Sequence, residues 1–291
     1  MTQNKRMEPS IRKTIDSLRQ ESATKPGRER TGDPDTPAGL MDDNRLIVFD
    51  GKPFPVGELA TEKLDRRLGE RADPSVFKVR LARSRALYDA GALVQRRYSH
   101  RGYETPSTPT EADPQLTTFV AYSQGVVVGT VGIRLDTSGT GRLGADDLYG
   151  EELKKLRDAG ARICEFTRLA VDTEASSKPI LAALFHTAYL FAYKVRGVDC
   201  AVIEVNPRHV IFYRRALKFD VIGPERLNRR VNAPAVLLCV SFESISEGLH
   251  QYAGKLDLTN KTHTLFPYGF PPEEEAGVLG RLRSLQESEL V

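Results

Sequence analysis

The sequence predicts a mixed α/β protein with one folded domain behind a disordered N-terminal arm. Between residues 75 and 244, short apolar runs with the spacing of strands alternate with segments whose apolar residues recur at helical spacing. The first 44 residues are instead rich in Thr, Pro, Gly and charge. A chain of 291 residues that is 40% hydrophobic is long enough to bury a sizeable core.

The N-terminal part divides into two segments. Residues 1–44 have too few large apolar side chains to offset the entropy of ordering them, so we expect a disordered arm with a short helix around residues 11–19. Residues 45–74 form an N-terminal extension, in which 45–50 predicts a short strand and 56–70 has helical spacing.

The folded domain opens with a strand at residues 75–81 and a helix from 84 to about 98. Two strands at 117–122 and 126–135 then flank the short connection Ser123-Gln124-Gly125. A connection of this length that contains glycine is typical of a β-hairpin, so the two strands are expected to be antiparallel.

The other elements follow from further apolar runs. In order they are a short helix at 151–158, a strand at 163–171, a long helix at 178–195, a strand at 200–205, a helix from 206 to about 217, and strands at 219–222 and 235–242. Asn206 and Pro207 suit the cap and first turn of a helix. Beyond residue 244 the pattern is mixed, with one expected helix at 275–286.

Composition argues against several classes of protein. The formal net charge of +3 is too small for a dedicated nucleic-acid binder. Cys164, Cys200 and Cys239 form no CxxC pair and each lies in an apolar stretch, which predicts buried, reduced packing residues and no metal site. No apolar run approaches the roughly 18 residues that cross a bilayer, and the first residues lack a secretory signal. We therefore expect a cytoplasmic protein without a membrane span.

Four segments carry a resemblance to a known family. They are EFTRLAV at 165–171, NPRHVIFYRR at 206–215, IGPER at 222–226 and VNAPA at 231–235. Together with the element order, they resemble the N-acyl amino acid synthases of FeeM type. That group is related to the acyl-homoserine lactone synthases, which share an E-x-[ST]-R strand motif. The resemblance covers roughly residues 75–244.

The resemblance implies a GNAT-like fold, in which a mixed, mostly antiparallel sheet is flanked by helices. This domain would span residues 75–244 and be followed by a C-terminal extension at 245–291. The implied reaction is transfer of a fatty acyl group from acyl carrier protein to the amine of an amino acid. No tightly bound cofactor is implied, and acyl-phosphopantetheine on the carrier protein, or acyl-CoA, is the co-substrate.

One loop departs from the pattern of acetyl-CoA-dependent relatives. Those proteins carry a [QR]-x-x-G-x-[GA] loop, because glycine lets consecutive backbone N–H groups approach a pyrophosphate. Here residues 172–179 contain no glycine. The single phosphodiester of a phosphopantetheine needs less of such a loop, so the departure favours a carrier protein, although Ser176 and Ser177 could hold one phosphate.

Glu165 and Tyr213 are the candidate catalytic residues. An amine is mostly protonated near neutral pH, so a positioned base such as Glu165 would help it to attack the thioester. Glu165 could instead orient the acceptor's ammonium group, or simply pair with an arginine. The resemblance gives Tyr213 the role of protonating the departing thiolate, and core packing with a satisfied hydroxyl is its alternative.

Arg168 is the candidate that would bind the acceptor's carboxylate, through the two-pronged geometry of a guanidinium group. In a regular strand, Glu165 shares a face with Thr167 and Leu169, while Arg168 points the other way. Arg168 and Glu165 could therefore meet only if the strand bulges, a distortion common beside active sites. A purely structural role for Arg168 is equally open.

Further candidates for substrate binding lie on other elements. His209 precedes Tyr213 by four residues and so shares its helical face, although a cap or surface role is the alternative. Arg97 and Tyr103 lie where related synthases close a loop over the acceptor, which is an expectation from the resemblance alone.

The acyl chain and its carrier have candidate residues as well. Ala182 leaves space on the helix at 181–193, where Phe185 and Tyr189 could line a channel, and ordinary core packing explains the same composition. Arg226, Arg229 and Arg230 could form a basic rim that steers an acidic carrier protein, with a solvated surface as the alternative.

Three other functions remain open on the same fold. The strand motif alone would also suit an acyl-homoserine-lactone-type synthase. A CoA-dependent N-acetyltransferase is disfavoured by the missing glycine loop. A non-enzymatic binding module would use the basic clusters to hold nucleic acid or a protein.

Overall fold

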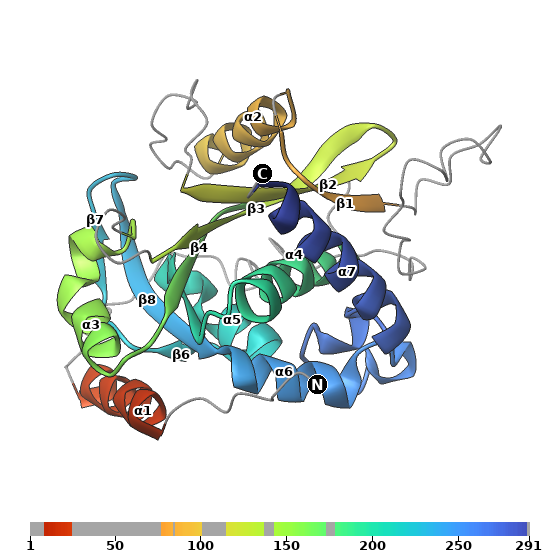
Figure 1. Ribbon diagram of the computed structural model, residues 1–291. Coiled ribbons are helices and arrows are strands. Elements are labelled where there is room, and N and C mark those ends of the chain that lie inside the picture. The colour runs from red at the N-terminus through yellow and green to blue at the C-terminus, as the bar shows by residue number, and fades with distance from the viewer. Residues whose placement is uncertain are drawn as a thin grey trace, which may run out of the picture.

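The computed structural model describes residues 9–24, 77–83, 85–100, 115–136, 143–172 and 178–289. Within these residues, eight strands form one sheet in the order β1-β2-β3-β4-β5-β8-β6, with β7 paired to β8 (Figure 1). The strands are β1 Phe77–Leu81, β2 Leu116–Ser123, β3 Val126–Leu135, β4 Ile163–Val171, β5 Cys200–Val205, β6 Asp220–Val221, β7 Arg226–Asn228 and β8 Ala233–Ser241. Only β4 and β5 pair in parallel, so the predicted mixed, mostly antiparallel sheet is confirmed.

Helices cover both faces of this sheet (Figure 1). They are α1 Pro9–Thr24, α2 Arg85–Ser99, α3 Asp146–Asp158, α4 Lys178–Tyr189, α5 Val210–Leu217, α6 Phe242–Tyr252 and α7 Pro272–Glu289. The main core joins one face to α4, α5, α6 and α7, while α1 with α3, and separately α2, bury the opposite face. None of the helices described is both long and apolar enough to cross a membrane.

The predicted hairpin between β2 and β3 is present, and its loop has two residues, because Ser123 belongs to β2 and not to the connection. Ser123 pairs with Val126, and Gln124 and Gly125 between them have φ angles of 50° and 79°. Positive φ at both positions is the signature of a type I′ turn, whose twist matches that of the flanking strands. Glycine at the second position adopts this conformation without a steric penalty.

The sheet splays between β4 and β5. The two strands pair only from Ile163 opposite Cys200 to Glu165 opposite Val202. Beyond Glu165, β4 stays paired with β3 and β5 stays paired with β8, so the two halves of the sheet separate. The separation opens a gap in the sheet beside Glu165.

A β-bulge follows in β4. Gly132 pairs with Thr167 and Thr130 pairs with Ala170, so two residues of β4 oppose a single residue of β3. Arg168 is one of the two and has a φ of 50°. The extra residue reverses the alternation of side chains beyond the bulge. Leu169 therefore packs against the main core, whereas in a regular strand it would share a face with Glu165. The expectation for Leu169 is therefore wrong.

Part of the predicted disordered arm is an ordered helix. In α1, Ile11, Ile15 and Leu18 recur at helical spacing and are buried against α3 and neighbouring strands. These three side chains supply the burial that stabilises the helix, so the short helix expected around residues 11–19 is present and extends over residues 9–24. The predicted strand at 45–50 and helix at 56–70 lie outside the described residues.

The C-terminal part is more ordered than the sequence pattern indicates. Neither β7 nor α6 was expected, and α6 begins directly after β8, where the Ser241 hydroxyl accepts a hydrogen bond from the Ser244 N–H at 3.1 Å. The predicted last helix is present as α7. Leu265, Phe266 and Phe270, which lie between α6 and α7, are buried in the main core.

Candidate active site

A cavity of about 400 Å³ lies where β4 and β5 separate. Its walls come from α2, β3, β4, β5 and the segment from β7 to β8, with α5 and the turn before it at one side. Glu165, Thr167 and Arg168 from β4 line it together with His209 and Tyr213. These five catalytic and substrate-binding candidates are thus brought to one cavity.

Glu165 is the buried acid of this cavity, with 5% of its surface exposed. Its Oε2 accepts hydrogen bonds from the backbone N–H groups of Gly144, at 2.5 Å, and Ala145, at 3.4 Å. Burial, with the charge of Glu204 as a smaller contribution, raises the pKa of Glu165 to about 7, although the two amides and Arg230 act in the opposite direction. A carboxyl group with a pKa near 7 is matched to proton transfer at physiological pH.

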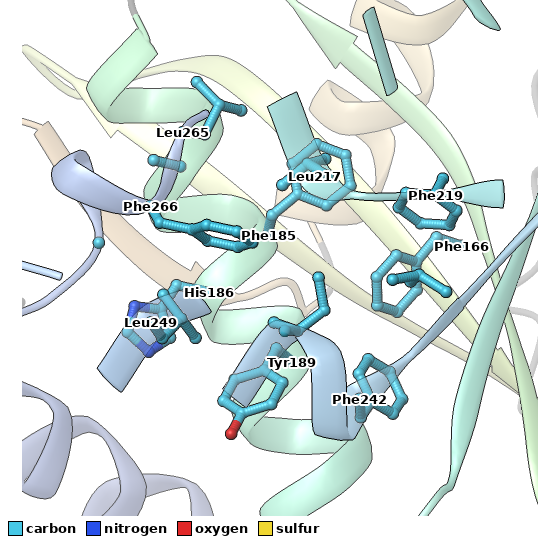
Figure 2. Close-up of a pocket in the computed structure, with 14 residues that line it drawn as sticks. Phe166, Phe185, His186, Tyr189, Leu217, Phe219, Phe242, Leu249, Leu265 and Phe266 are labelled. Carbon is cyan, nitrogen blue, oxygen red and sulfur yellow. The ribbon is translucent and has the colours of Figure 1, made fainter. Parts of the chain in front are cut away.

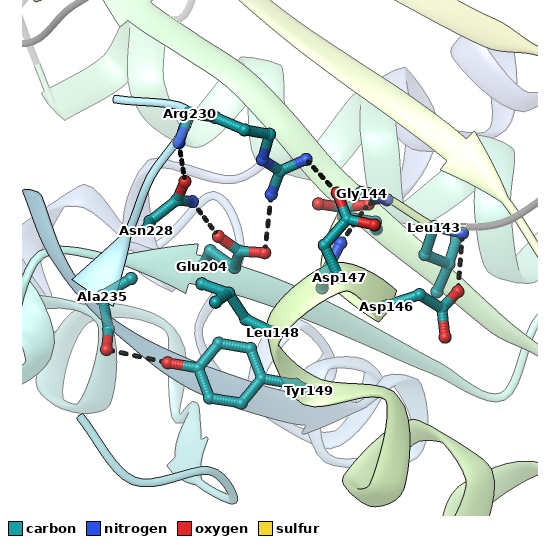
Figure 3. A network of polar contacts seen from close by, with 12 residues as sticks. Leu143, Gly144, Asp146, Asp147, Leu148, Tyr149, Glu204, Asn228, Arg230 and Ala235 are labelled. Atoms are coloured by element: carbon teal, nitrogen blue, oxygen red, sulfur yellow. Dashed lines mark hydrogen bonds and ion pairs between the residues drawn. The ribbon is translucent and has the colours of Figure 1, made fainter. Parts of the chain in front are cut away.

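The amides that hold Glu165 belong to a rigid turn before α3. The Asp146 carboxylate accepts a hydrogen bond from the Leu143 N–H at 2.9 Å, as Figure 3 shows. Arg157 in turn donates to both oxygens of Asp146, at 2.7 and 2.9 Å, and to Asp136. A Cβ added at Gly144 would lie 3.0 to 3.2 Å from the Arg230 guanidinium and the Glu165 carboxylate. The close approach of this turn to both charged groups therefore favours glycine, since a side chain would push against both of them.

A second carboxylate, Glu204 on β5, also lines the cavity and is held by two partners (Figure 3). Asn228 Nδ2 donates to one oxygen at 2.5 Å and Arg230 Nη2 to the other at 2.9 Å. Arg230 also lies 3.8 Å from Asp147. Burial raises the pKa of Glu204, while Arg230 and Asn228 stabilise its anion. This network was not found from the sequence, because its members are 24 to 26 residues apart and no short motif links them.

Arg168 reaches the cavity through the bulge in β4, which was the condition for it to meet Glu165. The φ of 50° at Arg168 resets the alternation, and Arg168 and Glu165 line the same space. Arg134 from β3 lines it too, although only Arg168 and Arg230 were proposed from the sequence. The cavity thus combines guanidinium groups from three elements with the carboxyl groups of Glu165 and Glu204.

Tyr213 is largely buried on α5 and packs edge-on against Phe185, with ring centroids 6.4 Å apart. It also packs against Phe212 and Phe219. His209 lies in the turn before α5, where its Nε2 is 3.3 Å from Arg208 Nε. Both side chains border the cavity, and the core contacts of Tyr213 fix its ring.

The outcome differs for Arg97 and Tyr103, the two residues expected where a loop closes over the acceptor. Arg97 is buried on α2 and is not among the residues that line the cavity, whereas Gln95 and Tyr98 on the same helix are. Tyr103 lies outside the described residues, as do residues 173–177 of the loop without glycine.

Comparison with known proteins assigns the family. Residues 89–241, just over half of the chain, match the family described as N-acyl amino acid synthase FeeM. The chain belongs to this synthase family. This confirms the resemblance seen in the sequence and identifies the protein as an acyltransferase.

The chain is also similar to several solved structures. FeeM, an N-acyl amino acid synthase from uncultured soil microbes, is 27% identical, with a TM-score of 0.52 over 59% of this chain and 93% of that chain. The acyl-homoserine lactone synthase LasI is 17% identical, with a TM-score of 0.42 over 57% and 90%. An N-acetyltransferase from Staphylococcus aureus Mu50 is 12% identical, with a TM-score of 0.42 over 58% and 99%. No curated protein matches the chain.

A second, smaller cavity of this FeeM-family protein is almost entirely apolar (Figure 2). Its volume is about 30 Å³. All three predicted acyl-channel residues, Ala182, Phe185 and Tyr189, line it. Phe185 and Phe166 line both cavities, so these two rings stand between the polar cavity and the apolar one.

The three predicted docking arginines of this synthase have different surroundings. Arg226 forms a two-pronged ion pair with Glu152, at 2.7 and 3.0 Å, and its guanidinium lies 4.7 Å from the centre of the Tyr149 ring. Arg230 pairs with Glu204 in the cavity, and Arg229 is exposed. Arg226 is half-buried and Arg230 is exposed, and each forms an ion pair with a largely buried carboxylate.

The cysteines and the possible metal ligands of this protein remain to be placed. Cys164, Cys200 and Cys239 are buried and free, and burial raises the pKa of the Cys164 thiol, which makes it unreactive. In the part of the chain that the structure describes, no three His, Cys, Asp or Glu side chains gather as a metal site would require.

Proposed function

We propose that this synthase transfers a fatty acyl group from acyl carrier protein to the amine of an amino acid. The observation that carries the proposal is the buried Glu165 carboxyl group, whose pKa is about 7, on the wall of a cavity that also contains Arg168 and Tyr213. The family match supports amide formation as the reaction class.

In the proposed reaction, Glu165 takes one proton from the acceptor's ammonium group and passes it to solvent. The neutral amine then attacks the thioester carbonyl carbon, so a C–N bond forms and the C–S bond breaks. The second proton that the nitrogen loses balances the proton that the departing thiolate gains. Tyr213 is the proposed donor of that proton, since its ring is fixed beside the cavity.

The acceptor is proposed to be an amino acid because the cavity offers guanidinium groups for a carboxylate. Arg168 is held on the bulge of β4, and a guanidinium group binds a carboxylate through two parallel hydrogen bonds. Thr167 and His209 supply further polar groups on the same wall. We propose that Arg97 and Tyr103 contact the acceptor only in the complex with bound substrate.

The acyl chain is proposed to leave the polar cavity between Phe166 and Phe185 and to enter the apolar one. Ala182, Phe185 and Tyr189 would surround it there. Burying the chain removes apolar surface from water, at about 25 cal/mol per Å². This gain favours a fatty acyl group over an acetyl group, and it requires the side chains around the cavity to move apart, because about 30 Å³ holds only a small part of such a chain.

The proposed donor is a carrier protein, with acyl-CoA as the alternative co-substrate. The glycine-free sequence at residues 172–179 supports this choice, as does the exposed Arg229 near the cavity residue Arg230. Carrier proteins are acidic, so exposed cations would attract them.

A direct assay tests the proposal. The purified protein is incubated with carrier proteins charged with saturated acyl chains of defined length and with a pool of amino acids, and products are identified by mass spectrometry. We expect N-acyl amino acids. Absence of product with every carrier-bound and CoA-bound donor contradicts the proposed reaction, while turnover with acyl-CoA alone contradicts the choice of donor.

A further inference from the structure

We propose that the C-terminal segment at residues 242–289 forms the closed end of the apolar cavity and sets the longest acyl chain that the enzyme accepts. Phe266 and Leu249 are the specificity-determining residues. This inference rests on the proposed function, because it assigns the apolar cavity to the acyl chain.

The lining of the apolar cavity comes from two parts of the chain. One part lies within or beside the family match and contributes Phe166, Ala182, Phe185, His186, Tyr189, Leu217, Phe219 and Val240. The other part lies beyond residue 241, where the match ends, and contributes Phe242, Ile245, Leu249, Leu265, Phe266 and Gly269. Nearly half of the lining is therefore an addition to the synthase domain.

The residues beyond 241 line both ends of the cavity: Phe242 packs against Phe166, with ring centroids 6.1 Å apart, while Phe266, Leu265 and Leu249 lie at the other end (Figure 2). Phe166 and Phe185 border the polar cavity as well, so they mark the entrance. In the view of Figure 2, Phe266 and Leu265 lie on the other side of Phe185 from Phe166. An acyl chain that enters past Phe166 would therefore pass Phe242 near the entrance and meet Phe266 and Leu249 last.

The segment is anchored firmly enough to act as a wall. The Leu265 N–H donates to the Ala216 carbonyl at 2.9 Å, which ties the segment to the end of α5. His186 on α4 accepts a hydrogen bond from the Phe270 N–H on Nδ1 at 3.0 Å, and its Nε2 lies 3.1 Å from Glu275 on α7. Burial lowers the pKa of His186, so the neutral ring that makes both contacts is favoured.

The ring of Phe266 is fixed from behind. It lies directly against Gly248 on α6, where even a Cβ atom would overlap the ring, and the Lys218 ammonium group lies 5.7 Å from its centre. The ring therefore cannot retreat toward α6. With only about 30 Å³ free in front of it, a chain longer than the cavity must leave methylene groups outside.

The consequence is a sharp limit on chain length. Each methylene group that gains burial improves binding roughly fourfold, and a methylene group that cannot enter gains nothing. Replacing Phe266 or Leu249 with a smaller side chain would extend the cavity and move this limit to longer chains.

The test compares Phe266→Ala and Leu249→Ala with Leu282→Ala. Leu249 and Leu282 are matched, since both are leucines of the C-terminal segment with 7% and 6% exposure, and only Leu249 lines the cavity. Two profiles are measured for each protein with saturated chains of increasing length. One is calorimetric binding of free fatty acids, and the other is transfer from the carrier-bound thioester.

We expect Phe266→Ala, and to a smaller extent Leu249→Ala, to move the preferred length upward by roughly two to four carbons. Leu282→Ala should lose stability but keep the wild-type length profile. If Phe266→Ala does not fold, the milder Phe266→Leu takes its place in the same comparison.

Unchanged length profiles in folded Phe266 and Leu249 variants would overturn the inference. So would an equal shift in Leu282→Ala, which would indicate a general loosening of the core. Wild-type protein that binds fatty acids up to a limiting chain length but transfers none would contradict the proposed function. It would not contradict the inference that the C-terminal segment sets the limit.

Discussion

Glu165 takes its chemistry from the residues around it. Burial on β4 and the nearby charge of Glu204 favour its protonated form, and the amides of Gly144 and Ala145 favour its anion. The balance brings the pKa to about 7, so the group changes its protonation state where the enzyme would work. A carboxylate that formed a closed ion pair would stay ionised well below that pH.

Glu165→Gln separates the catalytic role of this group from its effect on stability. We expect turnover to fall roughly 10²- to 10⁴-fold, because glutamine accepts the two amide hydrogen bonds but takes no proton. Wild-type activity should rise with pH through about pH 7, as Glu165 loses its proton. An unchanged rate in the variant would remove Glu165 from the role of base.

The same variant has a defined effect on stability. Between pH 4.5 and about 7 the folded protein keeps a proton that the unfolded chain releases, so the free energy of unfolding of the wild type falls as pH rises. Glutamine does not titrate. Chemical denaturation at pH 4 and pH 8 should therefore show the variant gaining about 3 kcal/mol relative to wild type at the higher pH.

For single residues, the sequence predicted which side chains of one strand reach the site better than it predicted contacts between strands. Glu165, Thr167 and Arg168 lie within one motif, and strand alternation identified the bulge as the condition for Arg168 to join Glu165. Glu204 and Arg230 meet through pairing of β5 and β7 with β8, which strand spacing does not reveal. Arg230 was therefore predicted as part of a basic rim, whereas it pairs with Glu204.

At the scale of helices and strands, α5 lines the cavity on one side and presents an exposed basic surface on the other. His209 and Tyr213 line the cavity, while Arg214, Arg215 and Lys218 are exposed. The sequence from residue 206 to 218 contains no acidic residue. If the donor is an acidic carrier protein, this side of α5 is well placed to attract it near the cavity.

Reversing the charge of α5 tests that role. Arg214→Glu/Arg215→Glu should raise the KM for acyl carrier protein roughly 10- to 100-fold, and the effect should weaken at high salt. The rate with a short acyl-pantetheine donor should stay near the wild-type value. Arg281→Glu/Arg283→Glu, an equal charge change at exposed positions of α7, is the control. An equal loss in both double variants would show that only net charge matters.

Long elements with a strong apolar pattern were predicted well from the sequence. β4, β5 and the helix that runs through α4 into the π-helical turn at Leu190–Val195 have the predicted bounds. β7 has three residues and depends on its pairing with β8. α6 follows β8 without a loop, so the apolar run crosses the boundary between strand and helix. In both cases the local sequence pattern is too weak to predict the element.

At the scale of the whole molecule, segments from both ends of the chain are packed onto the synthase domain. α1 packs on α3, the helix that follows the amides holding Glu165. The C-terminal segment packs on α4 and closes the apolar cavity. The sequence underestimated both additions, because their apolar residues are few and become buried only against the completed domain.

Leu18→Ala measures the contribution of α1. Leu18 is 1% exposed and belongs to the core shared with α3, so its truncation should lower the free energy of unfolding by roughly 2 to 5 kcal/mol. Lys13→Ala, at an exposed position of the same helix, should have little effect. Urea denaturation of both variants gives the comparison. Equal stabilities would mean that α1 is not docked in solution.

The left-handed backbone at Arg168 restricts how this enzyme could be redesigned. A φ of 50° excludes β-branched replacements and is accepted most readily by glycine, asparagine and aspartate. A mutant library aimed at a new acceptor would therefore sample a narrow set of residues at this position. Arg134 on β3 lines the same cavity, and no left-handed φ limits the replacements at that position.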